Sequence, residues 1–370
     1  MSIREVMKNR IITSVIALAL LATMTAYGQT SVIKRNTSVK ASKGSTAMKW
    51  DHVSDYSEGM AKVGVNSYKE GFVDKTGKVV IPCKWRALES FSEGLALAHD
   101  DKYEKCGFIN KTGALVIPFK WKVAKSFSEG LAMVRDDSGK CGYIDKTGTL
   151  VIPCQWKQPK SDWRLGYGAS NFHDGLAYVG GEKGYGYIDK TGKVVIPCQY
   201  YTAWDFSEGL AHVEKGGQHG FIDKTGSMVV PMKWDDARYF SEGLALVKDN
   251  NDKWGYVDKT GKLVIPCKWI NSWSFSEGLA WVIDENRKYG YIDKTGSIVI
   301  PCKWKWATHF SEGLACVKDE NGKYGYIDKT GTVVIPCKWK DARSFSEGLA
   351  WVLDNNDWRH IINKQGQIVK

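Results

Sequence analysis

The sequence lacks the long apolar runs of a polytopic membrane protein. Its single apolar stretch of near-membrane length, Ile11 to Met24, lies at the N-terminus. It also lacks the composition of a disordered chain, because 43% of its 370 residues are apolar and 12% are aromatic. Proline is scarce, with nine residues against 38 glycines. A chain of this composition is expected to fold with many turns and many β-prone aromatic positions.

The N-terminal stretch has the features of an export signal. Arg4, Lys8 and Arg10 precede the apolar segment, and the small residues Ala26 and Gly28 occupy the two positions that a signal peptidase reads. A transmembrane anchor is the alternative, although the apolar core is shorter than the roughly 20 residues that a span needs. We therefore expect an exported protein, periplasmic, cell-surface or secreted, with no membrane span in its mature form.

The sequence divides into three segments. Residues 1–28 form the expected signal peptide, and the Ser/Thr-rich residues 29–47 are expected to be a flexible basic linker. Residues 48–370 are expected to form a single array of repeats.

An internal repeat of about 35 residues dominates the sequence. The motif Phe-Ser-Glu-Gly-Leu-Ala is followed by a polar loop, by Gly-aromatic-Ile-Asp-Lys-Thr-Gly, and by an apolar run ending in Ile-Pro-Cys-Lys-Trp, as in residues 290–304. The aromatic residue that opens the motif is Tyr56, Phe91, Phe127, Phe172, Phe206, Phe240, Phe275, Phe310 or Phe345. Nine units with this period indicate a repeat architecture in which each unit packs on its neighbours.

Local chemistry predicts the structure of each unit. Asp-Lys-Thr-Gly, as at residues 293–296, has the residues of a type I turn and is flanked by β-formers, which predicts a hairpin. The face shared by Val79, Ile81, Cys83 and Trp85 is predicted to be core, and the proline that recurs in eight units needs an edge or a bulge. Gly-Leu-Ala-x-Val predicts a third strand. Trp-x-x-Ala-x-x-Phe has the spacing of one 3₁₀ or α turn.

Three short strands per unit predict an all-β fold. We expect an open, solenoid-like array, because propeller blades usually carry four strands in about 40 to 50 residues and close with about four to eight blades. A closed β-propeller is the alternative, since the repeat array is preceded by an orphan Lys49-Trp50 and stops at Val369-Lys370, which are equivalent breaks in the motif.

The unit at residues 253–261, Lys-Trp-Gly-Tyr-Val-Asp-Lys-Thr-Gly, resembles the motif of the bacterial WG, or KWG, β-repeat family. The resemblance extends over residues 48–370 in nine copies. It implies repeat-mediated binding rather than a reaction. The literal Trp-Gly occurs in one unit only, and Tyr185, Tyr289 and Tyr324 replace the tryptophan elsewhere.

Nine cysteines in an exported chain raise the question of disulfides. Six of them share one repeat position, which Phe119 or Met232 fills in other units, so this site is expected to be buried and apolar. Equivalent sites in neighbouring units are expected to lie about 10 Å or more apart, beyond the roughly 7 Å reach of a disulfide. We therefore expect free, mostly buried thiols.

No catalytic residue, metal or cofactor is predicted. No two of the seven histidines are separated by three to five residues, and none lies near a Cys-x-x-Cys pair, so a zinc site has no support. The acidic loops 249–252 and 354–357 lack the alternation and glycine of a calcium loop and are interpreted as turns. The Ser-Glu-Gly segment recurs in every unit, so it is assigned to the fold, with the glutamate capping a turn or binding backbone amides.

Positions that vary between units are candidates for ligand binding. One is the residue after Gly-Leu-Ala, another is a second aromatic set, and the longest unit has an insertion within Lys157–Asn171. The candidate ligand-binding residues are Trp163, Arg164, Tyr167, Trp204, Trp273, Trp281, Trp306 and Trp351. Exposed rings on one face would form stacking platforms for a sugar polymer or a peptide, whereas structural packing is the alternative.

We therefore expect an exported, non-enzymatic repeat protein that presents an extended surface to a cell-envelope polysaccharide or a protein partner. Nucleic acid is not an expected partner, because the 52 Lys and Arg residues are interspersed with 41 Asp and Glu. A hydrolase acting on envelope polymers is one alternative, but no unit breaks the pattern with a clustered acidic or Ser/His pair. A purely structural spacer is the other, and buried aromatic positions would favour it.

Overall fold

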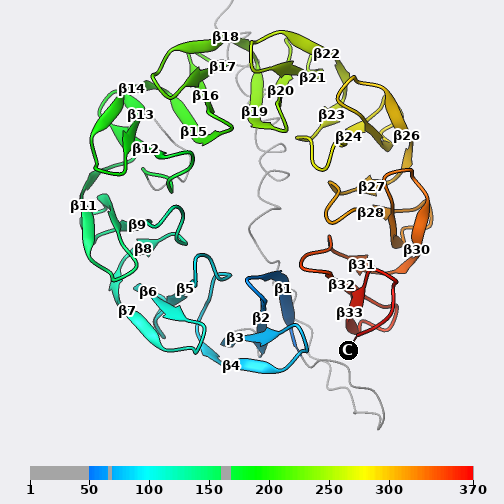
Figure 1. Ribbon diagram of the computed structural model, residues 1–370, viewed down its shortest axis with the longest axis horizontal. Helices are drawn as coiled ribbons and strands as arrows, with labels where there is room; N and C mark the ends of the chain where they lie inside the picture. The colour runs from blue at the N-terminus through cyan, green and yellow to red at the C-terminus, as the bar shows by residue number, and fades with distance from the viewer. Residues whose placement is uncertain (1–49, 66–68, 160–167, 370) are drawn as a thin grey trace, which may run out of the picture. The chain divides into compact units, whose positions relative to one another are not determined.

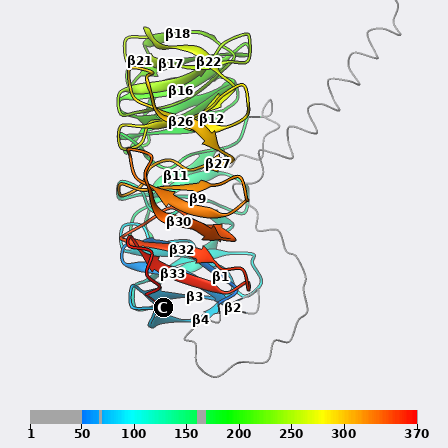
Figure 2. The same ribbon diagram turned by 90° about the vertical axis from the view of Figure 1, so that its right-hand side faces the viewer.

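Nine small antiparallel sheets make up the part of the chain that the structure describes. The computed structural model describes residues 50–65, 69–159 and 168–369, so the expected signal peptide and linker lie outside the described residues. Figure 1 shows these sheets as blades around a central opening, and Figure 2 shows that they keep to one layer. No helix among the described residues is long and apolar enough to cross a membrane.

Each blade is a meander whose strands follow one another from the centre of the ring outwards (Figure 1). The innermost strands are β1 (His52–Ser57), β8 (Val123–Ala124), β15 (Thr202–Ser207), β19 (Asp236–Ser241), β23 (Asn271–Ser272), β27 (Trp306–Ala307) and β31 (Asp341–Ala342). We number the blades 1 to 9 in chain order, from the sheet that contains β1 to the sheet that contains β31. In blades 2 and 4 single bridges, Leu88↔Ala98 and Ala169↔Val179, take the place of the innermost strand. The second strands are β2 (Met60–Val65), β5 (Leu95–His99), β9 (Ala132–Arg135), β12 (Leu176–Gly181), β16 (Leu210–Lys215), β20 (Leu244–Lys248), β24 (Ala280–Ile283), β28 (Ala315–Lys318) and β32 (Leu349–Leu353).

The two outer positions of each blade form the predicted hairpin. The third strands are β3 (Lys69–Asp74), β6 (Cys106–Asn110), β10 (Cys141–Ile144), β13 (Gly184–Asp189), β17 (Gln218–Asp223), β21 (Trp254–Asp258), β25 (Tyr289–Ile292), β29 (Tyr324–Ile327) and β33 (Arg359–Asn363). The outermost strands are β4 (Val79–Trp85), β7 (Leu115–Trp121), β11 (Leu150–Trp156), β14 (Val194–Tyr200), β18 (Met228–Trp234), β22 (Leu263–Trp269), β26 (Ile298–Trp304) and β30 (Val333–Trp339).

The hairpin turn forms as predicted. In blade 7 the Gly296 amide donates to the Asp293 carbonyl at 3.0 Å, and Asp293 Oδ1 accepts the amides of Thr295 and Ser297. Gly296 has φ +85°, and a Cβ there would lie 3.1 Å from Cγ2 of Ile265 in the preceding blade. Glycine is therefore required both by the backbone conformation and by the close approach of the two blades.

The recurrent proline lies on an edge, as predicted. Strand β4 pairs only with β3, and a register shift between the pairs Glu70↔Trp85 and Phe72↔Ile81 leaves the exposed Pro82 in a bulge. The predicted core face is correct in part, because Ile81 is fully buried and Cys83 and Trp85 are partly buried. Val79 is 41% exposed, since the bulge breaks the regular alternation.

The segment Trp-x-x-Ala-x-x-Phe is an inner strand, so the predicted helical turn is wrong. In blade 6 the pairs Ala237↔Val247 and Phe240↔Ala245 flank a one-residue register shift. A bulge inserts one extra residue, so two successive core-facing residues are three positions apart in sequence instead of two. This spacing resembles that of a helical turn. Each blade therefore has four strand positions rather than the expected three.

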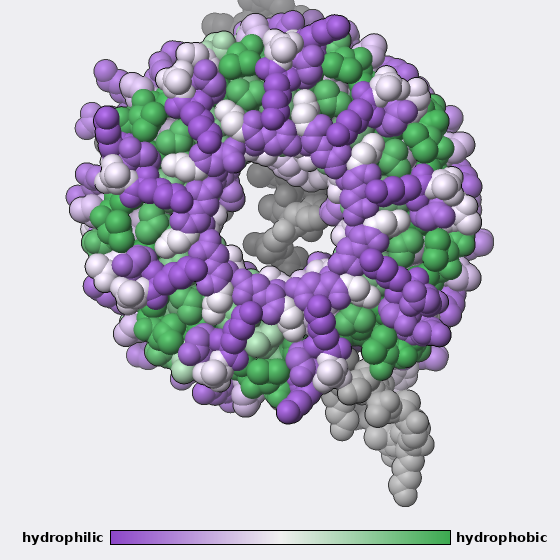
Figure 3. All heavy atoms as spheres, in the orientation of Figure 1, coloured by the Kyte–Doolittle hydropathy of each residue, from purple (hydrophilic) through white to green (hydrophobic). Residues whose placement is uncertain are grey.

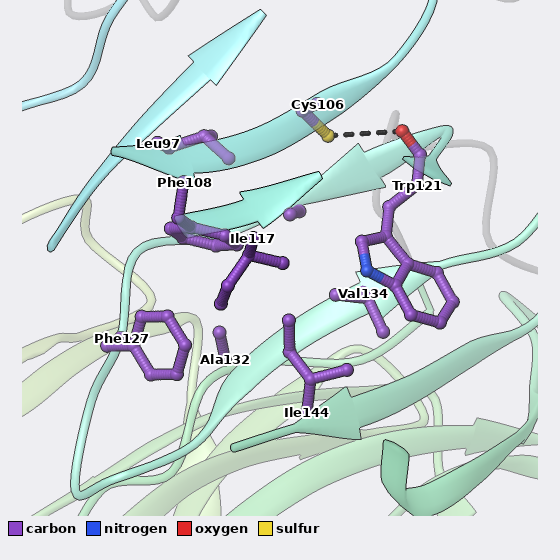
Figure 4. Close-up of a cluster of buried hydrophobic side chains, with 10 residues drawn as sticks. Leu97, Cys106, Phe108, Ile117, Trp121, Phe127, Ala132, Val134 and Ile144 are labelled. Carbon is purple, nitrogen blue, oxygen red and sulfur yellow. Dashed lines mark hydrogen bonds between the residues drawn. The ribbon is translucent and has the colours of Figure 1, made fainter. Parts of the chain in front are cut away.

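The hydrophobic core lies between blades rather than within them. Figure 4 shows Phe108, Ile117 and Trp121 of blade 2 packed against Phe127 and Ile144 of blade 3. The rings of Phe108 and Phe127 are 4.8 Å apart between centroids. A single blade has no apolar core of its own, so each blade is stabilised by its neighbours.

The array is a closed nine-bladed β-propeller, which corrects the expected open array. Ser346 Oγ of blade 9 donates to the Tyr56 carbonyl of blade 1 at 2.8 Å, just as Ser311 Oγ donates to the Phe345 carbonyl at 2.8 Å. The apolar side chain of Ile361 joins a buried cluster of blade 1 residues across this seam.

The length argument for an open array fails because the connections are short. Between Ser57 and Met60, which pair with each other, only Glu58 and Gly59 form the turn. Both have positive φ, +53° and +83°, as a two-residue type I′ hairpin requires. Four strands consequently fit into about 35 residues.

Candidate functional site

A glutamate from each Ser-Glu-Gly turn, or Asp174 in blade 4, ties each blade to the next. The carboxylate accepts the amide of the equivalent glycine in the following blade, and this bond recurs at all nine interfaces. In blade 6, Glu242 accepts Gly278 N–H at 3.0 Å and pairs with Lys294 Nζ at 3.1 Å. This assigns the glutamate of the Ser-Glu-Gly segment to the fold, where it binds backbone amides as predicted.

Three variable positions lie side by side on the inner three strands of each blade. In blade 7 they are Trp273, Trp281 and Tyr289, eight residues apart in sequence. The rings of Trp273 and Trp281 are stacked with centroids 6.0 Å apart and 14° between planes, and Trp281 lies 5.2 Å from Tyr289. We call these three positions the variable triplet.

The triplet carries different chemistry in every blade. Its members in the other blades are Ser54, Lys62 and Glu70; Glu89, Leu97 and Cys106; Lys125, Met133 and Cys141; Ser170, Tyr178 and Tyr185; Trp204, His212 and His219; Arg238, Leu246 and Trp254; Thr308, Cys316 and Tyr324; and Arg343, Trp351 and Arg359. Figure 3 shows that the residues around the central opening are mostly hydrophilic, with apolar patches farther out.

In blade 1 the triplet is charged and internally compensated. Glu70 pairs with His52 Nε2 at 2.8 Å and Lys62 Nζ at 3.6 Å, and it accepts the Leu88 amide at 2.6 Å. Burial alone would raise the pKa of Glu70, but these partners outweigh it and hold the pKa below its ordinary value.

In blade 3 the first triplet residue is a lysine, and burial lowers the pKa of the Lys125 ammonium.

In blade 5 an indole and two imidazoles form one stack. The rings of Trp204 and His212 are 3.9 Å apart and 10° from parallel, and His212 Nε2 lies 2.7 Å from His219 Nδ1. One imidazole must donate and the other accept in this contact, so the pair cannot carry two protonated rings while the bond persists. The two histidine side chains are therefore hydrogen-bonded to each other in this structure.

In blade 9 the triplet places an indole between two cations. The guanidinium groups of Arg343 and Arg359 lie 6.0 Å and 5.8 Å from the Trp351 ring. Trp351 also lines a small cleft of about 10 Å³ at the seam, together with Val53, Asp55 and other residues of blades 1 and 9. This is about the room that one water molecule needs, far less than a small-molecule pocket offers.

The structure places five of the candidate tryptophans on the two inner strand positions of their blades. Trp204, Trp273 and Trp306 belong to the inner segment, Trp281 to β24 and Trp351 to β32, and all five are partly exposed. Trp306 lies outside the triplet, two residues before its first position, and its ring is 5.5 Å from Tyr324. The other three candidates, Trp163, Arg164 and Tyr167, lie outside the described residues.

Sequence reasoning missed the third member of the triplet and the two arginines at its first position. The signal was the spacing, because residues 238, 246 and 254 are separated by eight, as are residues 343, 351 and 359. On successive antiparallel strands, this eight-residue spacing places the three side chains next to one another.

The remaining reactive groups are assigned to the fold. The nine cysteines are free, and burial raises the pKa of the Cys106 thiol to about 11. Asp249 Oδ1 accepts the amides of Asn251 and Lys253, so this acidic loop is a turn, as interpreted from sequence. No group of three or more His, Cys, Asp or Glu residues in the described part could hold a metal ion.

Comparison with solved structures finds weak likenesses. BamB from Moraxella catarrhalis superposes with a TM-score of 0.42 at 11% identity, over 86% of this chain and 97% of that one. The extracellular domain of the putative hybrid two-component system BT3049 from B. thetaiotaomicron gives 0.27 at 11% identity, over 87% and 51%. KlHsv2 with loop 6CD replaced by a Gly-Ser linker gives 0.38 at 7% identity, over 65% and 91%. At these values the likenesses carry no argument about function.

No curated protein sequence matches this chain. A family model does match, and its description is "WG containing repeat". The eight matched segments are residues 71–101, 107–141, 142–179, 185–218, 220–254, 254–287, 289–324 and 324–358. Together with the nine blades that the structure shows, these matches establish that the chain belongs to the WG-containing repeat family.

Proposed function

We propose that this propeller is an exported, non-enzymatic protein that binds a cell-envelope glycan on the inner strands of blades 5 to 9. The observation that carries the proposal is the contrast between a nearly invariant frame and the variable triplet within it. Trp204, Trp273, Trp281 and Trp351 belong to the triplets of these blades and keep part of their surface open to solvent.

The composition of the triplets supports a binding role. Where packing alone is needed, this chain uses aliphatic residues at the second triplet position, such as Leu97, Met133 and Leu246, all fully or nearly fully buried. Indole rings at the same position in Trp281 and Trp351 stay partly exposed. Partly exposed aromatic rings on one wall offer the flat apolar surface on which sugar rings stack.

A titration of purified envelope polysaccharide tests this proposal, with tryptophan fluorescence and calorimetry as readouts. We expect saturable binding that Trp273→Ala weakens at least tenfold. The matched control is Trp358→Ala, because Trp358 is 39% exposed in a loop outside the triplets. This control is expected to bind like the wild type.

Three results would contradict the proposal. Equal binding by both variants would remove the inner strands from the site. A fall in polymer length during incubation would make the protein a hydrolase. Capture of a defined envelope protein, with no glycan binding, would replace the glycan by a protein partner.

Export is tested separately, by the mass and location of the protein made by growing cells. We expect a mature chain that begins at Gln29 and is found outside the cytoplasm. A full-length chain in the cytoplasmic fraction would contradict this part of the proposal.

A further inference from the structure

Arg238 lies between tryptophans of two neighbouring blades. It is the first residue of the blade 6 triplet, and its guanidinium carbon is 4.5 Å from the ring centroid of Trp273 in blade 7. On its other side it is 5.6 Å from the ring of Trp254, the tryptophan of the one literal Trp-Gly in the chain. The two indoles hold the guanidinium in place through cation–π contacts.

This guanidinium has no anionic partner among the residues that the structure describes. Arg238 makes no ion pair there, and its Nε is covered from solvent without a hydrogen-bond partner. By contrast, the lysine of the hairpin turn is paired in most blades, as Lys259 is with Glu208 at 3.0 Å. Because Nε is covered, an anion would have to bind through the terminal guanidinium nitrogens.

Aromatic surface is available beside this cation, because the Trp273 ring, 4.5 Å from the guanidinium carbon, is partly exposed. In blade 9, Arg343 occupies the position equivalent to Arg238 and lies 6.0 Å from Trp351 of its own blade.

From this geometry we infer that Arg238, with Trp273, forms a subsite for a carboxylate-bearing sugar of an acidic glycan. The guanidinium binds the carboxylate, and the Trp273 ring stacks on the apolar face of the sugar. The inference rests on the proposed glycan-binding function and adds the chemical class of the ligand.

A carboxylated sugar fits this arrangement better than the other anions do. A free phosphate would use the guanidinium alone and leave the exposed part of the Trp273 ring without a role. An acidic peptide would bring carboxylates on flexible side chains, with no sugar ring to stack on Trp273. We therefore commit to the glycan and include the peptide as an outcome of the test.

The experiment is calorimetric titration of the mature protein with galacturonic acid hexasaccharide at low and moderate salt. The fully methyl-esterified hexasaccharide is the matched neutral ligand, since it keeps the sugar rings and loses the charge. Arg238→Gln is compared with Lys268→Gln, which removes the same charge from an exposed lysine that also lies over an indole, 4.9 Å from Trp269 on the outer strand β22.

We expect Arg238→Gln to weaken binding of the acidic hexasaccharide at least tenfold, and Lys268→Gln to change it less than twofold. The methyl ester should bind the wild type about as weakly as the acidic hexasaccharide binds Arg238→Gln. Circular dichroism spectra and melting temperatures of the two variants will show whether they remain folded, and Arg238→Lys provides a second variant that keeps the charge but loses the planar group.

Specific outcomes would overturn the inference. Equal affinity for the acid and its ester would mean that the site does not read the carboxylate, although glycan binding as such would stand. Tighter binding of poly-glutamate than of the hexasaccharide would assign the site to an acidic peptide. No binding of either hexasaccharide by the wild type would remove this ligand class, while the titration with envelope polysaccharide would still decide the proposed function.

Discussion

The carboxylate of Glu347 accepts a hydrogen bond from the amide of Gly59, 288 residues away in the sequence, at 3.0 Å. The same carboxylate pairs with Lys75 Nζ at 2.9 Å. The same bond joins each of the remaining pairs of neighbouring blades, with Asp174 in place of the glutamate in blade 4. Blade 9 therefore meets blade 1 in the same way as any two neighbours meet.

The first prediction concerns this seam. Glu347→Ala removes a charge-assisted hydrogen bond and should lower the free energy of unfolding by about 1 to 2 kcal/mol. Glu242→Ala, at an interior interface, should lower the free energy of unfolding by the same amount, because both glutamates have the same turn conformation and bind equivalent glycine and lysine residues. Urea denaturation of the two variants measures the difference. If only Glu242→Ala destabilises the protein, the seam does not form in solution.

The second prediction concerns acid. The hydrogen bond from Lys75 lowers the pKa of Glu347 from 4.5, and the burial that opposes it is weaker. For Glu208 burial is the larger single effect and would raise the pKa, but Lys259 and the Gly243 amide together outweigh it. A group with a lowered folded-state pKa stabilises the protein above its unfolded-state pKa and loses this contribution as pH falls.

The melting temperature should therefore decline as the pH falls below about 4.5 and change little between about pH 5 and pH 8. Thermal unfolding followed by circular dichroism from pH 3 to pH 8 measures this dependence. The decline should be shallower in Glu347→Gln than in the wild type. A melting temperature that is constant down to pH 3 would show that these carboxylates do not hold the blades together.

The third prediction concerns the thiols. Burial raises the pKa of Cys302 to about 11 and that of Cys141 to about 12, so few thiolates exist near neutral pH. Native protein at pH 8 should react slowly with an aromatic disulfide reagent, and denatured, unreduced protein should titrate close to nine thiols, the number of cysteines in the chain. A titration near one thiol after unfolding would reveal disulfides.

The fourth prediction compares core with surface in one blade. Trp269 is 6% exposed and packs with Phe275 and Val282 of the next blade. Trp269→Ala should therefore cost about 3 to 5 kcal/mol. Lys259→Ala breaks a surface ion pair and should cost less than about 1 kcal/mol. Denaturation midpoints of the two variants measure this contrast, and similar losses would show that the Trp269 side chain is not part of the core.

Much of the local structure of the repeat could be predicted from the sequence. The chemistry of residues 293–296 predicts the turn, and the lack of an amide donor in Pro82 predicts an edge, because both requirements are set by the residue itself. The inner strand was predicted wrongly because the bulge between Ala237 and Phe240 gives a strand the spacing of a helix.

Closure depends on information that no single repeat carries. A ring forms when the small rotation between successive blades adds up to a full turn, and that rotation depends on packing between side chains such as Phe108 and Phe127. The candidate residues were found where aromatic side chains vary conspicuously, as at Trp281. Arg238 was missed because its role comes from Trp254 and Trp273, which lie beside it only once the strands are paired.

The distance across the seam tests the closed ring most directly. Spin labels attached through unnatural amino acids at Thr76 and Gln365, in the hairpin turns of blades 1 and 9, report this distance by pulsed electron resonance without using the native cysteines. The same labels at Thr295 and Thr330 report the distance between two adjacent interior blades. The closed propeller predicts the same distance distribution for both pairs. A seam pair far longer than the interior pair, in a folded protein, would contradict closure and restore the open array.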